Sequence, residues 1–142
     1  MEAKEHVHVF DTTLQKTNEI LKDIEDYFGW KDRNKAYLAL RVVLHTLRDR
    51  LPVEAAAAFG AQLPMLVKGF YYDGWKPSAA PLKMSKAEFI GEIERQIDPL
   101  SFEQKTENIV KGILEVIEKH IEPAEIKKIK NLLPKDIREM LA

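Results

Sequence analysis

The sequence of 142 residues contains no cysteine, which excludes disulfide bonds, thiol nucleophiles and thiolate metal sites together. Serine is scarce, and two of the three serines, Ser85 and Ser101, stand where helix caps are expected. A glycine-rich phosphate loop, a nucleophile elbow and a metalloprotease helix motif are also missing. We therefore expect no catalytic residue, no metal site and no cofactor, and a non-enzymatic protein is favoured.

Neither sign of charge is in large excess, because the sequence has 22 basic and 23 acidic residues and its formal net charge is −1. The first 71 residues hold 10 basic and 10 acidic side chains, and the second 71 hold 12 and 13. We therefore expect no nucleic-acid or anionic-membrane partner. The least polar run, residues 55–67, is too short to span a bilayer, and the amino terminus lacks the apolar core of a signal peptide. These features predict a soluble cytoplasmic protein.

Helical periodicity dominates the chain and predicts an all-α fold of six main helices. Residues 1–10 have no clear period and are expected to form a loose arm. The first helix should begin at Asp11 or Thr12, use Leu14 on its apolar side and end at Gly29. Capping boxes are expected at residues 85–88 and 101–104. Leu63-Pro64 and Leu133-Pro134 should each kink or split a helix.

The two halves repeat the same pattern. At a constant shift of 70 residues the apolar positions of one half fall on those of the other, and Leu63-Pro64 falls on Leu133-Pro134. We interpret this as two pseudo-repeated three-helix units, residues 11–72 and 84–142, joined by a linker at residues 73–83. A unit of about 60 residues buries its apolar faces poorly alone, so residues 1–142 are expected to form one domain.

Two groups of residues are candidate binding sites. Arg41, His45 and Arg48 recur at helical spacing and form a cationic stripe, which either holds an anionic ligand or makes ion pairs on the surface. The segment from Leu63 to Pro77 carries the densest aromatic cluster. Its rings either cover the joint between the two units or form a contact surface for a partner, with the following residues as anchors: Tyr71, Tyr72, Trp75 and Lys76.

The sequence Leu-Pro-Met-Leu-Val-Lys-Gly-Phe-Tyr-Tyr-Asp-Gly-Trp-Lys-Pro at residues 63–77, together with Leu51-Pro52, Phe89 and Glu92, resembles the bacterial family of domain of unknown function 2267. The resemblance covers nearly the whole chain. It implies a small, all-helical, cytoplasmic bacterial protein. It implies no reaction and assigns no catalytic residues.

The leading hypothesis is a non-enzymatic protein-interaction module, which could form a homodimer through the surface around Tyr71, Tyr72, Trp75 and Lys76. The alternative is a protein that binds a small anionic ligand, or an unrecognised enzyme, whose pocket lies between the two units and includes Arg41, His45 and Arg48.

Overall fold

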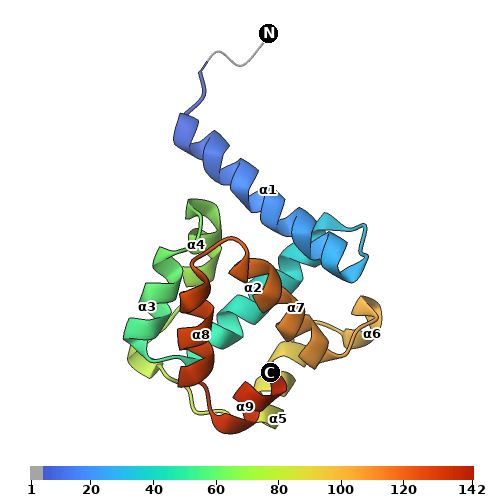
Figure 1. Ribbon diagram of the computed structural model, residues 1–142, viewed down its shortest axis with the longest axis vertical. Coiled ribbons are helices and arrows are strands. Elements are labelled where there is room, and N and C mark those ends of the chain that lie inside the picture. Colours follow the sequence, from blue (N-terminus) through green and yellow to red (C-terminus); the bar gives the residue numbers. More distant parts are fainter. Residues whose placement is uncertain (1–4) are drawn as a thin grey trace.

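A computed structural model describes residues 5–142, and these residues fold into nine α-helices and one short 3₁₀ helix (Figure 1). The elements in chain order are α1 (His8–Phe28), α2 (Arg33–Arg50), α3 (Val53–Ala61), α4 (Met65–Tyr72), η1 (Pro77–Ala79), α5 (Lys86–Glu94), α6 (Pro99–Phe102), α7 (Thr106–Glu118), α8 (Pro123–Leu132) and α9 (Lys135–Met140). The predicted all-α class is confirmed. None of the helices in the described part of the chain combines the length and the apolar character that a membrane crossing requires.

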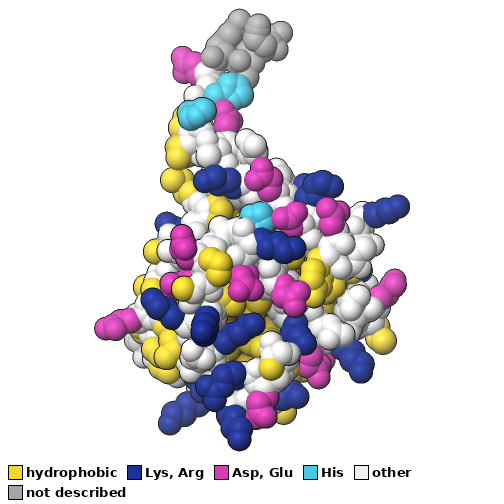
Figure 2. Space-filling model, viewed as in Figure 1, with side chains coloured by type: hydrophobic (Ala, Val, Ile, Leu, Met, Phe, Trp, Pro, Cys, Tyr) yellow, Lys and Arg dark blue, Asp and Glu magenta, His cyan; other side chains and the backbone are white. Residues whose placement is uncertain are grey.

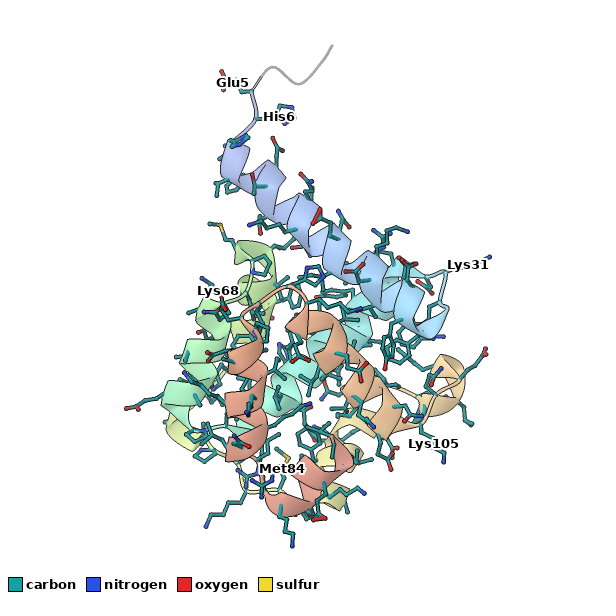
Figure 3. All side chains as sticks on the ribbon, viewed as in Figure 1. Glu5, His6, Lys31, Lys68, Met84 and Lys105 are labelled. Carbon is teal, nitrogen blue, oxygen red and sulfur yellow. The ribbon has the colours of Figure 1, made fainter. Side chains whose placement is uncertain are left out.

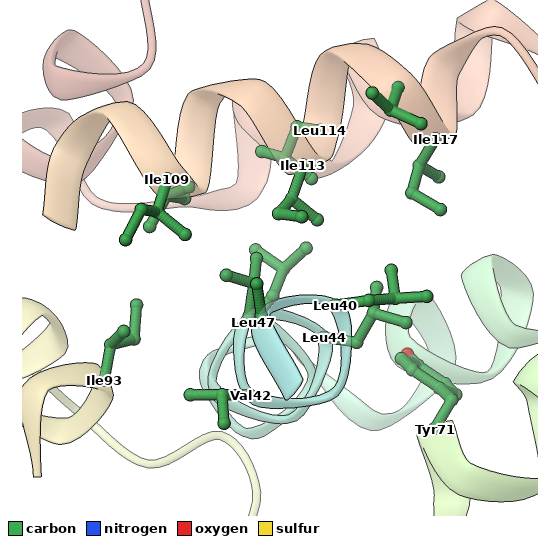
Figure 4. Close-up of a cluster of buried hydrophobic side chains, with 14 of the residues drawn as sticks. Leu40, Val42, Leu44, Leu47, Tyr71, Ile93, Ile109, Ile113, Leu114 and Ile117 are labelled. Atoms are coloured by element: carbon green, nitrogen blue, oxygen red, sulfur yellow. The ribbon is translucent and has the colours of Figure 1, made fainter. Parts of the chain in front are cut away.

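Helix α2 forms the centre of the fold and contacts α1, α4, α5 and α7. Its apolar residues are buried on more than one side, as expected for a helix that others surround. Figure 4 shows Leu40, Leu44 and Leu47 directed toward the isoleucines of α7, while Ile93 of α5 and Tyr71 of α4 approach from the sides. One continuous core therefore joins the two halves of the chain.

Local signals explain many of the helix ends. Gly29 ends α1 in the left-handed conformation at φ 73°, which glycine adopts without steric cost. Asp32 accepts a hydrogen bond from the Lys35 amide and caps α2, and Ser85 and Glu88 form the predicted capping box of α5. The second predicted box is wrong: Ser101 lies inside α6, and α7 begins only at Thr106. Asp98 caps α6 instead, so the chain makes an extra turn there.

The number of helices exceeds six because both Leu-Pro sequences separate two helices and because α6 is an additional one. Pro64 precedes α4 with φ −56° and ψ 152°, and Pro134 precedes α9 with φ −56° and ψ 153°. Proline cannot donate the hydrogen bond that would continue the preceding helix, so a new helix starts after it.

Helix α1 extends beyond the rest of the molecule (Figure 1). We call its outer part together with its amino-terminal cap, residues 7–15, the arm. The expectation of a loose segment over residues 1–10 is wrong from His8 onward, since α1 begins there, whereas residues 1–4 lie outside the described part. Leu14 was expected on the core side but is 53% exposed, because the core ends before the helix does.

Candidate interaction surface

The predicted cationic stripe of α2 meets the carboxyl-terminal end of α4. Arg48 is buried, and its Nη1 donates hydrogen bonds to the carbonyl oxygens of Tyr71 at 2.7 Å and Asp73 at 3.1 Å. Its Nε donates to Asp49 Oδ1 at 2.9 Å. The last carbonyls of a helix lack intrahelical partners and carry partial negative charge, so Arg48 satisfies and neutralises the end of α4.

The other two cations contact the same helix end. His45 is half-buried and donates from Nε2 to the Phe70 carbonyl oxygen at 2.5 Å. Burial lowers the pKa of His45, and the neighbouring Arg48 and Arg41 lower it further. Arg41 Nη2 donates to Asp73 Oδ2 at 2.9 Å, and this contact lowers the pKa of the Asp73 carboxyl. The stripe therefore has partners within the molecule, and an anionic ligand for it stays a prediction.

The predicted aromatic anchors differ strongly in exposure. Tyr71 is fully buried, and its hydroxyl donates to the Ala56 carbonyl oxygen at 2.7 Å. Tyr72 and Trp75 are half-buried, and their ring centroids lie 5.4 Å apart. The Tyr72 ring fits beside Gly60, where a Cβ would overlap its hydroxyl oxygen. Tyr71 and Tyr72 thus join α4 to α3, while Trp75 packs against Tyr72 and Phe70 packs against Tyr37 of α2.

Lys76 is exposed and lines a small cavity with Asp49 and Leu82. The structure thus brings Tyr71 and the α2 stripe together around the end of α4, while Lys76 points away from the core. Of the four aromatic-segment residues, only Tyr72, Trp75 and Lys76 have surface that a partner could contact, and such contact stays a prediction.

A larger concavity lies between the two halves. It has a volume of about 400 Å³ and is bordered by α1, the α3–α4 connection and the end of α7. Its polar lining includes Lys16, Glu19 and His120, and His120 Nε2 also lies 2.7 Å from Asp23 Oδ2. Arg41, His45 and Arg48 do not border this concavity, so the predicted pocket and the predicted cations are in different places.

A surface that the sequence analysis did not identify lies on the arm and the start of α4. Six large apolar side chains are exposed there; helix geometry places Val9 (45%) on another side of the arm, and the other five are Val7 (55%), Phe10 (60%), Leu14 (53%), Met65 (53%) and Leu66 (42%). We call these other five the apolar face. Figure 2 shows hydrophobic side chains along the edge of the arm that faces α4. Exposed apolar groups in a contiguous patch are typical of interaction sites, whereas isolated ones are ordinary.

The two parts of the apolar face are held together by a direct contact. The Leu66 amide donates a hydrogen bond to Thr13 Oγ1 at 2.8 Å, so the first turn of α4 lies against the arm. Figure 3 shows Glu5 and His6 at the outer end of the arm, far from the body of the molecule. The exposed apolar side chains of the arm and of the first turn of α4 therefore lie on neighbouring segments.

A seven-residue repeat in the sequence could have revealed this face. Residues 7, 10, 14, 17, 21, 24 and 28 alternate in steps of three and four, which is the spacing of a helix-packing seam. In the structure Thr17, Leu21 and Ile24 are buried by the rest of the chain. Val7, Phe10 and Leu14 continue the same line past the point where the body ends. Among the described residues, the seam thus continues beyond the part of α1 that other helices cover.

The fold and this surface define a small all-helical protein whose first helix projects from a compact body. Residues 17–140 match the family described as "Uncharacterized conserved protein (DUF2267)", and the chain belongs to this family. The comparison with curated proteins found no match. The matched region begins at Thr17, where α1 joins the body, so the arm lies outside it.

Proposed function

We propose that the protein is a non-enzymatic, cytoplasmic protein-interaction module that binds an amphipathic α-helix on its apolar face. The observation that carries this proposal is the helix-packing seam that continues from the core of α1 onto the exposed arm. A seam of this spacing accepts the apolar ridge of another helix, because knobs from one helix enter holes on the other. Its exposed members are large and carry no charge, which suits a contact that excludes water.

We also infer that the chain consists of two related units, residues 11–72 and 84–142, with the linker at residues 73–83. The buried positions along α8 and α9 follow those along α3 and α4 at the shift of 70 residues: Ile126, Ile129, Leu133, Ile137 and Leu141 against Ala56, Phe59, Leu63, Val67 and Tyr71. Helix α5 begins at Lys86, which corresponds to Thr17 at the shift of 69 that relates the first helices. In this alignment, the first helix of the second unit begins at the position that corresponds to the end of the arm. The second unit thus has no counterpart of the arm, so an arm is not required to form such a unit.

One consideration weighs against the alternative prediction of an anion site between the units. The cations predicted to hold the anion, Arg41, His45 and Arg48, already bind α4 carbonyls and Asp73. A ligand would have to displace these contacts. Tyr72, Trp75 and Lys76 remain predicted contact residues for a partner, separate from the apolar face.

The test is a titration with a fluorescently labelled peptide of idealised leucine heptads, followed by anisotropy at low protein concentration. Wild type and Gln15→Asp should bind it. Phe10→Asp should not, because a charge would be buried in the seam. Gln15→Asp is the matched control, since Gln15 is also exposed on the arm but stands outside the seam.

A chain lacking residues 1–15 completes the experiment. It should unfold within a few degrees of the wild-type temperature and no longer bind the peptide. The proposed function would be refuted if the wild-type protein did not bind the peptide, or if Phe10→Asp bound it as tightly as the wild type does. A truncated chain that fails to fold would instead refute the inference that the arm is dispensable to the first unit.

A further inference from the structure

We infer that the helix bound by the apolar face is α1 of a second copy of this chain, so that two arms pair antiparallel in a symmetric homodimer. This inference rests on the proposed function and names its partner. It uses the arm and the first turn of α4, and it does not involve the aromatic segment at residues 71–76. Its basis is the area, the shape and the polarity of the apolar face.

The exposed area matches what a dimer requires. With full side-chain areas of roughly 150–200 Å² each, the exposed fractions of the five residues correspond to an apolar area on the order of 450 Å² per copy. A standard interface buries about 800 Å² per partner, of which somewhat more than half is apolar. One apolar face on each of two copies therefore supplies the apolar part of a standard interface.

The shape of the molecule favours exchange between two identical copies. Each copy presents both a projecting helix and, beside it, the exposed apolar residues at the start of α4 (Figure 1). A two-fold axis can place the arm of each copy along the apolar face of the other, and both faces are then covered at once. A head-to-tail contact would leave one face open at each end of the assembly.

The direction of pairing follows from where the seam is free. From Thr17 onward the seam is occupied by the chain's own helices. In a parallel pair both bodies would lie at the same end of the helices and compete for the same space. In an antiparallel pair the bodies lie at opposite ends, and the shared stretch is limited to residues 7–16, or about 15 Å of helix.

The spacing of the seam also determines the register. In antiparallel helix pairs the two kinds of seam position alternate across the interface, which places Phe10 of one copy opposite Leu14 of the partner subunit. Val7 then lies at the end of the partner's free seam, because Thr17 of each copy is already buried by its own chain. Charged side chains stay outside the seam.

The experiment is sedimentation velocity with light scattering over a wide micromolar concentration range. Wild type and Gln15→Asp should approach twice the chain mass of 16.4 kDa as the concentration rises. Phe10→Asp should raise the dimer dissociation constant at least about thirty-fold, as expected for loss of a central anchor. Circular dichroism should show unchanged helix content, since Phe10 does not contribute to the core.

Because the chain has no cysteine, single introduced cysteines report the register without background. A mixture of Phe10→Cys and Leu14→Cys should cross-link to a mixed dimer under mild oxidation, whereas each variant alone should cross-link poorly. Cross-linking of Phe10→Cys to itself would overturn the antiparallel register. A wild-type monomer at all concentrations that still binds the heptad peptide would overturn the dimer but keep the proposed function. A monomer that binds no peptide would overturn both.

Discussion

Gly112 lies in α7 at the point where α7 contacts the carboxyl-terminal end of α1. A Cβ at this position would overlap Phe28 Cζ and lie 2.6 Å from Tyr27 Cε1. Phe28 cannot simply turn aside, because its ring stacks on Trp30 with a centroid distance of 4.4 Å and meets Tyr27 edge-on at 4.8 Å. Gly112→Ala should therefore push α1 away from α7.

Two opposing terms determine the size of this effect. Replacing glycine by alanine inside a helix normally stabilises the fold by about 0.5–1 kcal/mol. Overpacking by one methyl group in a closely packed site typically costs about 1–3 kcal/mol. The expected net change is a loss of about 0–2.5 kcal/mol in the free energy of unfolding, and a central value of about 1 kcal/mol corresponds to a melting temperature roughly 3–4 °C lower.

Urea unfolding followed by circular dichroism measures this difference, and Gly91→Ala provides the matched control. Gly91 also lies inside a helix, α5, but a Cβ there has nothing within 4 Å. Gly91→Ala should thus be more stable than wild type by about 0.5–1 kcal/mol. If Gly112→Ala were stabilised to the same extent, the close contact between α1 and α7 would be refuted. Adding Phe28→Leu should recover part of the loss, because the smaller side chain leaves room for the methyl group.

Two further predictions concern the contact between α2 and α4. Arg48→Met leaves the Tyr71 and Asp73 carbonyls without their donor, so the free energy of unfolding in urea should fall by about 2–3 kcal/mol; a change below about 0.5 kcal/mol would mean that water replaces Arg48 at no cost. Burial lowers the pKa of His45 below its ordinary 6.5, so the unfolded chain takes up a proton at a higher pH than the folded one. Stability should therefore decline as the pH falls below about 6.5. The variant His45→Gln keeps a hydrogen-bond donor for the Phe70 carbonyl but cannot take up a proton, so its stability should decline less. Urea unfolding midpoints measured from about pH 7.5 to about pH 5 test this difference. Equal slopes for both proteins would contradict this role of His45.

Much of the helical structure was predictable because its causes are local. The ends at Gly29, Asp32 and Ser85 depend on conformations and hydrogen bonds within a few residues, and sequence patterns describe such interactions well. The capping box predicted at residues 101–104 is wrong for a reason that is also local. Asp98 and Pro99 begin a helix two or three residues earlier, so Ser101 lies inside it. The break at Pro64 was predicted because proline lacks an amide hydrogen, which no tertiary contact can supply.

The candidate site was less predictable, because its decisive contacts join distant residues. The sequence places Arg41, His45 and Arg48 on one side of a helix, yet only the tertiary structure brings them to the end of α4, 25 residues beyond His45. It likewise buries Tyr71 while leaving Trp75 half-exposed, although both belong to one aromatic cluster.

By itself the sequence determined that the chain is helical, where many helices end, and which side of the longer helices is apolar. The tertiary structure decided which of these apolar sides are covered, and it leaves Phe10 and Leu14 exposed while burying Ile24 of the same helix. The physical reason is that periodicity arises from each helix alone, whereas burial depends on which other segments reach it.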